Sequence, residues 1–141
     1  MPLDVISFLF ARRALRRPPV PPFPVERTWH YGEVLPSALN AEVPVVVFPP
    51  QRGDYVVEGY VDVSKLERGE MAILREYISI DGETVKKFLE IGVVGPASEP
   101  IIRFHPKSLP YFAIYKVTLT QTSGELRKFP FAFVIDVLKQ A

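Results

Sequence analysis

From residue 28 onward, apolar side chains recur at every second position, and this period limits the folds that the chain can adopt. One segment shows the pattern clearly: Tyr55, Val57, Gly59, Val61 and Val63 alternate with Val56, Glu58, Tyr60 and Asp62. A period of two places neighbouring side chains on opposite faces of an extended strand, so that one face is buried and the other meets solvent. The body of the chain is therefore predicted to be all-β.

Eight segments show this alternation or a short apolar run bounded by turn residues. They are residues 28–34, 43–48, 54–63, 70–80, 83–93, 100–104, 111–120 and 126–138. Asp81-Gly82 stands between two alternating segments, which is a strong hairpin signal. Short strands with turn signals at regular spacing are typical of sandwiches and jelly rolls. We predict an antiparallel β-sandwich, jelly-roll-like, with about seven or eight strands.

Two of the segments contain residues that do not fit a plain half-buried strand. Glu76 falls on the apolar side of its segment. The last segment contains Pro130, which has no N–H to donate to a neighbouring strand, so we predict an edge strand or a bulge there. Its apolar face would carry Phe129, Phe131, Phe133 and Ile135. An exposed edge with such a face would pair with other chains unless another segment covered it.

The first 27 residues lack this period and are predicted to form an arm, residues 1–27, ahead of a sandwich domain at residues 28–141. Residues 3–17 predict a short helix that Asp4 caps and Pro18 ends. Five prolines then stand in residues 18–24, which predicts an extended polyproline II segment. Such a segment would hold the helix away from the domain.

Charge separates the arm from the body of the chain. Five arginines against Asp4 and Glu26 give the arm a formal charge of +3. The remaining 114 residues hold 12 basic and 14 acidic side chains, a net charge of −2. The body is therefore not expected to bind nucleic acid, and any such contact would fall to the arm.

Nothing in the chain predicts an enzyme, a metal site or a cofactor. There is no cysteine, and the two histidines, His30 and His105, stand far apart with no nucleophile-elbow motif. Glu58 and Asp62 fall on the solvent side of their strand, where acidic residues are ordinary. Asp81-Gly82-Glu83 is too short for a calcium loop.

The N-terminal apolar run does not predict a membrane span or a secretion signal. No stretch reaches the roughly 18 apolar residues that a bilayer requires. The positive charges follow the run at residues 5–11, which is the reverse of a secretory signal. We expect synthesis in the cytoplasm without a signal peptide.

The arm carries more large apolar side chains than a short helix can shield from water. We predict that it docks on a neighbouring copy, head to tail, with help from strand addition by residues 20–34. The residues predicted to make this contact are Val5, Ile6, Phe8, Leu9, Phe10, Arg12, Arg13, Arg16, Arg17, Val20, Phe23 and Val25. Three alternatives stay open: the arginines bind nucleic acid inside a capsid, the arm lies on a membrane surface, or it folds back over the phenylalanine strand of its own domain.

Aromatic residues provide a different candidate function. They are Trp29, Tyr31, Tyr55, Tyr60, Tyr77, Tyr111, Phe112 and Tyr115. Core packing between sheets explains most aromatic residues of a β protein. Tyr60 and Tyr77 fall on the polar faces of their strands, so a carbohydrate- or ligand-binding module is the alternative function.

Residues 54–136 resemble small β-sandwich structural proteins from viruses and extracellular filaments of hyperthermophilic archaea. The similarity lies in VEGYVD at residues 57–62, LREY at 74–77 with Asp81-Gly82, and KVTLTQT at 116–122. It implies a non-enzymatic subunit of a virion or extracellular filament, in which an N-terminal extension links neighbours. Fifteen prolines against eight glycines and two methionines fit a thermophilic source.

Overall fold

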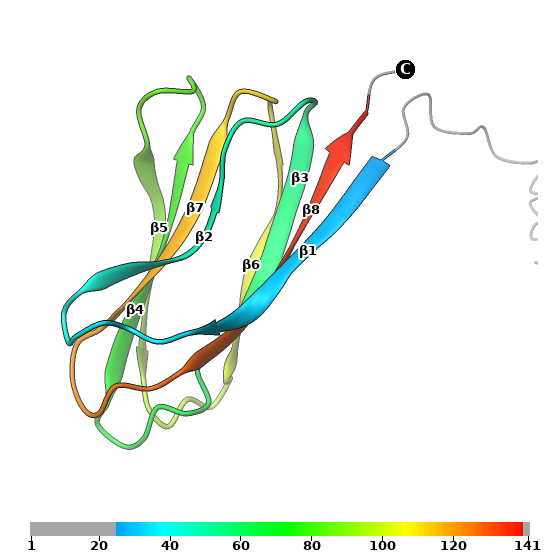
Figure 1. The fold of residues 1–141 in the computed structure, drawn as a ribbon. Coiled ribbons are helices and arrows are strands. Elements are labelled where there is room, and N and C mark those ends of the chain that lie inside the picture. The colour runs from blue at the N-terminus through cyan, green and yellow to red at the C-terminus, as the bar shows by residue number, and fades with distance from the viewer. Residues whose placement is uncertain (1–24, 140–141) are drawn as a thin grey trace, which may run out of the picture.

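The structure, a computed structural model, describes residues 25–139 and forms eight β-strands in this range (Figure 1). The strands are β1 (Val25–Val34), β2 (Glu42–Phe48), β3 (Tyr55–Asp62), β4 (Met71–Ser79), β5 (Lys86–Val94), β6 (Ile101–Leu109), β7 (Ile114–Gln121) and β8 (Phe129–Leu138). Each strand overlaps one predicted segment, and the all-β prediction is confirmed. The predicted helix at 3–17 and the proline-rich segment lie outside the described residues. β1 begins at Val25, inside the predicted arm.

The strands form two four-stranded antiparallel sheets that face each other (Figure 1). The first sheet has the order β1-β8-β3-β6 and the second has the order β2-β7-β4-β5. We call them sheet A and sheet B. Eight strands in two sheets with these crossovers make a jelly roll. The predicted jelly-roll-like sandwich is confirmed.

The core lies between the two sheets and is filled by the apolar positions of the alternating segments. The inner face of β3 is fully buried at Val57 and Val61, and that of β4 at Leu74. Phe104 and Phe133 meet in the core with ring centroids 5.6 Å apart. The period of two thus identifies the buried faces, because burying one face of each sheet against the other is what specifies the register of the strands.

Gly59 on β3 allows the closest packing in the core. A Cβ atom at this position would lie 2.1 Å from a ring carbon of Phe133, its partner on β8. The Phe133 ring therefore covers the glycine, and a larger residue cannot occupy the position without moving a buried ring. This contact explains why a glycine interrupts the large apolar residues on the inner face of β3.

The prediction that Phe129, Phe131, Phe133 and Ile135 lie on an edge strand is wrong. β8 lies inside sheet A, where β1 pairs with it on one side and β3 on the other. Pro130 is tolerated because it lies before Phe131, the first β8 residue paired with β3. The proline thus marked the beginning of a strand rather than an edge, and β1 covers the side that would have been exposed.

Strand β6 continues five residues beyond the predicted end of its segment at residue 104. Pro106 is tolerated within this strand because β6 is an edge strand of sheet A, and one of its sides needs no backbone donors. The pairing with β3 shifts register between Val57 and Gly59 and then resumes at Lys107. The continuation places Lys107 and Leu109 opposite the core-facing residues of β3.

An ion pair holds the loops together at one end of the sandwich. Arg127 donates from Nε and Nη2 to the two carboxylate oxygens of Glu70, each at 2.9 Å. The backbone N–H groups of Glu67 and Glu125 also donate to this carboxylate. These bonds, with the Arg127 side chain as the largest contribution, lower the pKa of Glu70 to about 2. The β3–β4 and β7–β8 loops are thereby fixed to each other at the end where β4 begins.

Substituting Gly59 with alanine tests the packing of the two sheets. The added methyl group would collide with the Phe133 ring, so we expect the free energy of unfolding to fall by about 1–3 kcal/mol, as overpacked cores typically do. Gly92→Ala is the matched control, because nothing lies within 4 Å of a Cβ atom there. Chemical denaturation of both variants measures the difference. Equal stability of Gly59→Ala and the unsubstituted protein would contradict this description of the core.

Candidate assembly surface

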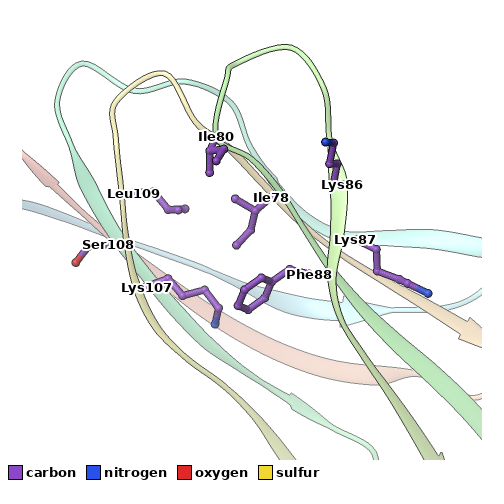
Figure 2. Close-up of a pocket in the computed structure, with 8 residues that line it drawn as sticks. All are labelled: Ile78, Ile80, Lys86, Lys87, Phe88, Lys107, Ser108 and Leu109. Atoms are coloured by element: carbon purple, nitrogen blue, oxygen red, sulfur yellow. The ribbon is translucent and has the colours of Figure 1, made fainter.

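The sandwich has two open sides, because the outer strands of the two sheets do not pair with each other. β1 and β2 flank one side, and β5 and β6 flank the other. A cavity of about 330 Å³ lies on the first side, where His30 packs edge-on against Phe48 at 4.8 Å between ring centroids. A larger cavity of about 580 Å³ lies on the second side (Figure 2). Its size is within the range of ligand pockets.

This second cavity is an open groove between the edges of the two sheets, and we call it the β5–β6 groove. It is lined by Ile78, Ile80, Lys86, Lys87, Phe88, Lys107, Ser108 and Leu109. Figure 2 shows Ile78, Phe88 and Leu109 pointing into the space between the strands, whereas Lys87 and Ser108 point away. Ile80 is 71% exposed and Phe88 59% exposed. The groove is therefore an apolar surface that the described residues leave uncovered.

A register shift lies beside the groove on each of its two edge strands. Between β4 and β5, Glu76 pairs with Leu89 and Tyr77 with Lys87, which leaves Phe88 as the extra residue. Between β3 and β6, the shift falls at His105-Pro106 and turns Lys107 and Leu109 toward the core side. Bulges re-aim side chains and interrupt pairing at sheet edges. Here they direct side chains into the groove and make both edges poor templates for another strand.

A buried charged cluster lies behind the groove. Glu76 is fully buried, and its Oε2 accepts a hydrogen bond from the Tyr115 hydroxyl and forms an ion pair with Lys107 Nζ at 2.9 Å. Its Oε1 has no partner among the described residues. Burial and the bond to Glu76 raise the pKa of Tyr115, so the phenol stays a donor. The acidic residue that interrupted the apolar face in the sequence is thus the anchor for a lysine that reaches across the sandwich.

Two of the three lysines around the groove are paired with acidic neighbours. Lys107 is paired with Glu76, and Lys87 Nζ lies 2.9 Å from Glu90 Oε1. Lys107 Nζ also lies 5.7 Å from the centre of the Phe88 ring, close enough for a cation–π contact. The groove is consequently apolar and close to neutral, and it does not favour an anionic ligand strongly.

Strand β1 provides a second exposed surface, at the opposite edge of sheet A. All ten of its residues pair in unbroken register with β8, whereas β2, β5 and β6 are each interrupted by a register shift. Nine of the ten are exposed, including Trp29 and Tyr31. Val25, the one predicted docking residue that the structure describes, is also exposed at the start of β1. The free side of β1 is thus the longest regular edge in the described domain.

The prediction that residues 20–34 add a strand to a neighbouring copy is wrong for residues 25–34. These residues form β1 and pair with β8 of the same chain. At residues 25–27 the predicted arm therefore lies along β8 of its own domain, as one of the open alternatives proposed, and the rest of β1 belongs to the predicted sandwich. Every other predicted docking residue, from Val5 to Phe23, lies outside the described residues, and its docking stays a prediction.

Three exposed aromatic residues, Trp29, Tyr31 and Tyr60, lie on the outer face of sheet A. Tyr31 and Tyr60 both pair with Ala132, from opposite sides of β8. A shallow hollow lies beside Tyr60 and Ile101. Tyr77 does not form a free surface, because its hydroxyl donates to Glu42 at 2.5 Å and Lys116 Nζ lies 5.0 Å from the centre of its ring.

The two histidines of the described residues lie far apart. His30 lies on β1 and His105 on β6, at opposite edges of sheet A. In residues 25–139, no group of three or more histidine, aspartate or glutamate side chains is placed to hold a metal ion. This range also has no helix long and apolar enough to cross a membrane.

The β5–β6 groove was not predicted from the sequence. The sixth predicted segment ends at residue 104 and leaves Lys107 and Leu109 outside it, although their spacing continues an alternation across a bulge. The signal for the buried cluster was present in Glu76, the acidic residue on an apolar face. The lysine that satisfies it lies 31 positions later in the chain, and only the fold brings the two together.

Comparisons with known proteins give a structural likeness without a sequence family. No protein-family model and no curated protein matches the chain. Among solved structures, a chain from the endospore appendages of Bacillus, described as a family of disulfide-linked pili, is similar with a TM-score of 0.56 and 14% sequence identity. The match covers 84% of this chain and 91% of that one. At this identity the likeness shows a shared fold.

Viral capsid chains show a weaker likeness. A chain of the infectious bursal disease virus VP2 subviral particle matches with a TM-score of 0.42 and 9% identity, over 83% of this chain and 33% of that one. A chain from the Gx strain of the same virus matches with a TM-score of 0.44 and 7% identity, over 82% and 32%. Scores this low do not establish a shared fold.

Substituting Lys107 tests the buried cluster behind the groove. In Lys107→Ala, Glu76 would stay buried without its cation, so we expect the free energy of unfolding to fall by about 3–5 kcal/mol. Lys87→Ala, which breaks an exposed pair, should change it by no more than about 1 kcal/mol. Urea denaturation at neutral pH measures both.

The double variant Glu76→Gln with Lys107→Met separates the missing cation from lost packing. It removes both charges, and we expect it to recover most of the lost stability. Lys107→Ala as stable as the unsubstituted protein, or no recovery in the double variant, would contradict the assignment of a buried ion pair.

Proposed function

We propose that this protein is a self-assembling structural subunit of a filament or virion shell, whose N-terminal arm docks on a neighbouring copy by burying apolar side chains. The observation that carries the proposal is the open β5–β6 groove, an uncovered apolar surface on a complete jelly roll. The arm supplies an apolar segment in the same chain. A subunit with an apolar anchor and a separate apolar acceptor has the parts needed for self-association.

The energy of docking is large enough to matter. Burying each of Val5, Ile6, Phe8, Leu9 and Phe10 would contribute about 1.5–3 kcal/mol, which gives roughly 8–15 kcal/mol as an upper bound. Association costs about 4–15 kcal/mol in lost freedom. The two ranges overlap, so one arm holds marginally, and a regular array of many such contacts makes the assembly stable.

Contacts besides the apolar anchor would add to the interface. The arm's four arginines at residues 12–17 face a body with a net charge of −2, which favours pairing with acidic residues of a neighbour. Strand addition, where it contributes, would use the free side of β1, because the other edge strands carry register shifts. The arm of one copy would bind a surface of the next copy that differs from the arm itself, which is a head-to-tail contact. Repeated head-to-tail contacts build a filament unless the rotation between successive subunits closes a ring.

The likeness to the endospore appendage chain supports this function by analogy, since that chain belongs to pili. Those pili are described as disulfide-linked. The 141 residues here contain no cysteine, so subunits joined through them are held without disulfides. A location in a virion or an extracellular filament follows from the proposed role.

A carbohydrate- or ligand-binding module is the second candidate. The observation that favours it is the outer face of sheet A, where Trp29, Tyr31 and Tyr60 are exposed beside a shallow hollow. Aromatic rings on such a surface suit the apolar faces of sugars. A capsid role in which the basic arm contacts nucleic acid stays a further prediction, with binding that would be weak and salt-sensitive.

Charged substitutions in the arm of the full-length chain test the proposal. Leu9→Asp with Phe10→Asp removes two apolar anchors, so we expect the concentration needed for assembly to rise by roughly 100-fold or more. Ser7→Asp adds a charge without removing an apolar side chain and should assemble like the unsubstituted protein. Sedimentation and negative-stain imaging measure the assembly. Full-size assemblies from the double variant at the normal concentration would refute the docking role of the arm.

A further inference from the structure

We infer that the β5–β6 groove is the acceptor for the arm of a second copy, which inserts the side chains of Ile6, Leu9 and Phe10 between β5 and β6. This assignment rests on the proposed function, and it adds the place where the arm binds. It also names the occupant of the apolar surface formed by Ile80 and Phe88.

The groove is built to accept side chains rather than a strand. Each of its edge strands has a register shift beside the cavity, and each shift turns side chains inward. An added strand would need an unbroken row of backbone groups, which neither edge provides. A helix that presents apolar side chains at three-to-four spacing needs only the cavity, and residues 3–17 are predicted to form such a helix.

The chemistry of the groove also suits this occupant. Its inward-pointing residues are apolar except for Lys107, and Lys107 and Lys87, two of its three lysines, are already paired with glutamates. An apolar segment can therefore enter without leaving a new charge unpaired. One exposed carboxylate, Glu83, precedes the β5 part of the groove in the sequence, within the same hairpin. It is a candidate to meet the arginines that follow the apolar residues of the arm.

The spacer predicted ahead of β1 is long enough to reach the groove of a neighbour. Val25 pairs with Leu138, and Leu109 lies at the same end of sheet A across β8 and β3. Three inter-strand spacings separate β1 from β6, about 14 Å. A polyproline II segment at residues 18–24 would be about 22 Å long. This length exceeds the width of sheet A, so the arm can extend beyond its own domain, and the mixing experiment below distinguishes a neighbour's groove from the chain's own.

Substitution of Phe88 in the full-length chain tests the acceptor site. Phe88→Glu places a charge in the groove at an exposed position, and we expect at least a 10-fold rise in the concentration needed for assembly, with an unchanged melting temperature. Val94→Glu is the matched control, because Val94 lies on the same strand, is 54% exposed and does not line the groove. The control should assemble normally.

Mixing two inactive variants tests whether the arm binds a second copy. The Leu9→Asp and Phe10→Asp variant keeps its groove, and Phe88→Glu keeps its arm. Neither should extend alone, but an equal mixture should form dimers of one copy of each and nothing larger. Native mass spectrometry measures the composition. A mixture that stays monomeric would overturn the inference.

A cysteine pair gives a measurement that does not depend on the stability of Phe88→Glu. The chain has no cysteine, so a Leu9→Cys copy mixed with an Ile80→Cys copy can form only the disulfides that these positions allow. We expect a covalent dimer of the two copies after mild oxidation, and no such dimer when Val94→Cys replaces Ile80→Cys. Equal cross-linking at both positions would contradict the assigned acceptor.

The outcomes separate this inference from the proposed function. If the arm variant fails to assemble while Phe88→Glu assembles normally, the arm docks elsewhere and only the acceptor assignment is wrong. If the arm variant assembles normally, the proposed function is wrong and the acceptor assignment falls with it.

Discussion

Burial of one face of each sheet against the other is the interaction on which this structure depends. It fixes the register of every strand, because a slip of one residue would turn the apolar positions toward water. The contact is tight where the Phe133 ring covers Gly59. Packing the sheets together buries their apolar inner faces, but it leaves the outer strands of each sheet without a pairing partner on one side. A two-sheet sandwich therefore has open sides, and the properties of those sides decide how copies meet.

The two open sides differ in a way that follows from the sequence. On the β5–β6 side, a register shift interrupts the regular pairing of each edge strand, and the shifts turn Phe88, Lys107 and Leu109 toward the space between the sheets. The buried pair of Glu76 and Lys107 lies behind that space. At the other edge of sheet A, β1 keeps a regular edge with exposed aromatic residues. The β5–β6 side thus suits the burial of a partner's side chains. The free edge of β1 suits backbone pairing with another strand, and its exposed aromatic residues suit contact with a partner's surface.

The sequence contained the local information about the fold and lacked the long-range part. The period of two identified all eight strands, because half-burial of a strand leaves its mark in every second residue. The position of β8 was wrong, because Pro130 marks either an edge or the beginning of a strand and the local sequence does not distinguish them. Glu76 was visible as an exception, but its partner Lys107 comes from another sheet. The groove depends on two strands that never pair, so no local pattern could predict it.

In the proposed assembly, the apolar arm of one copy docks in the open β5–β6 groove of the next, and no disulfide is needed to hold the copies together. A reconstruction of the assembled particle by electron cryo-microscopy, at a resolution that shows side chains, tests this most directly. The account predicts continuous density from β1 of one copy through the proline-rich segment to the β5–β6 groove of the next, with Phe10 beside Phe88. Assembled particles in which that groove is empty, or is filled by the arm of the same copy, would contradict it.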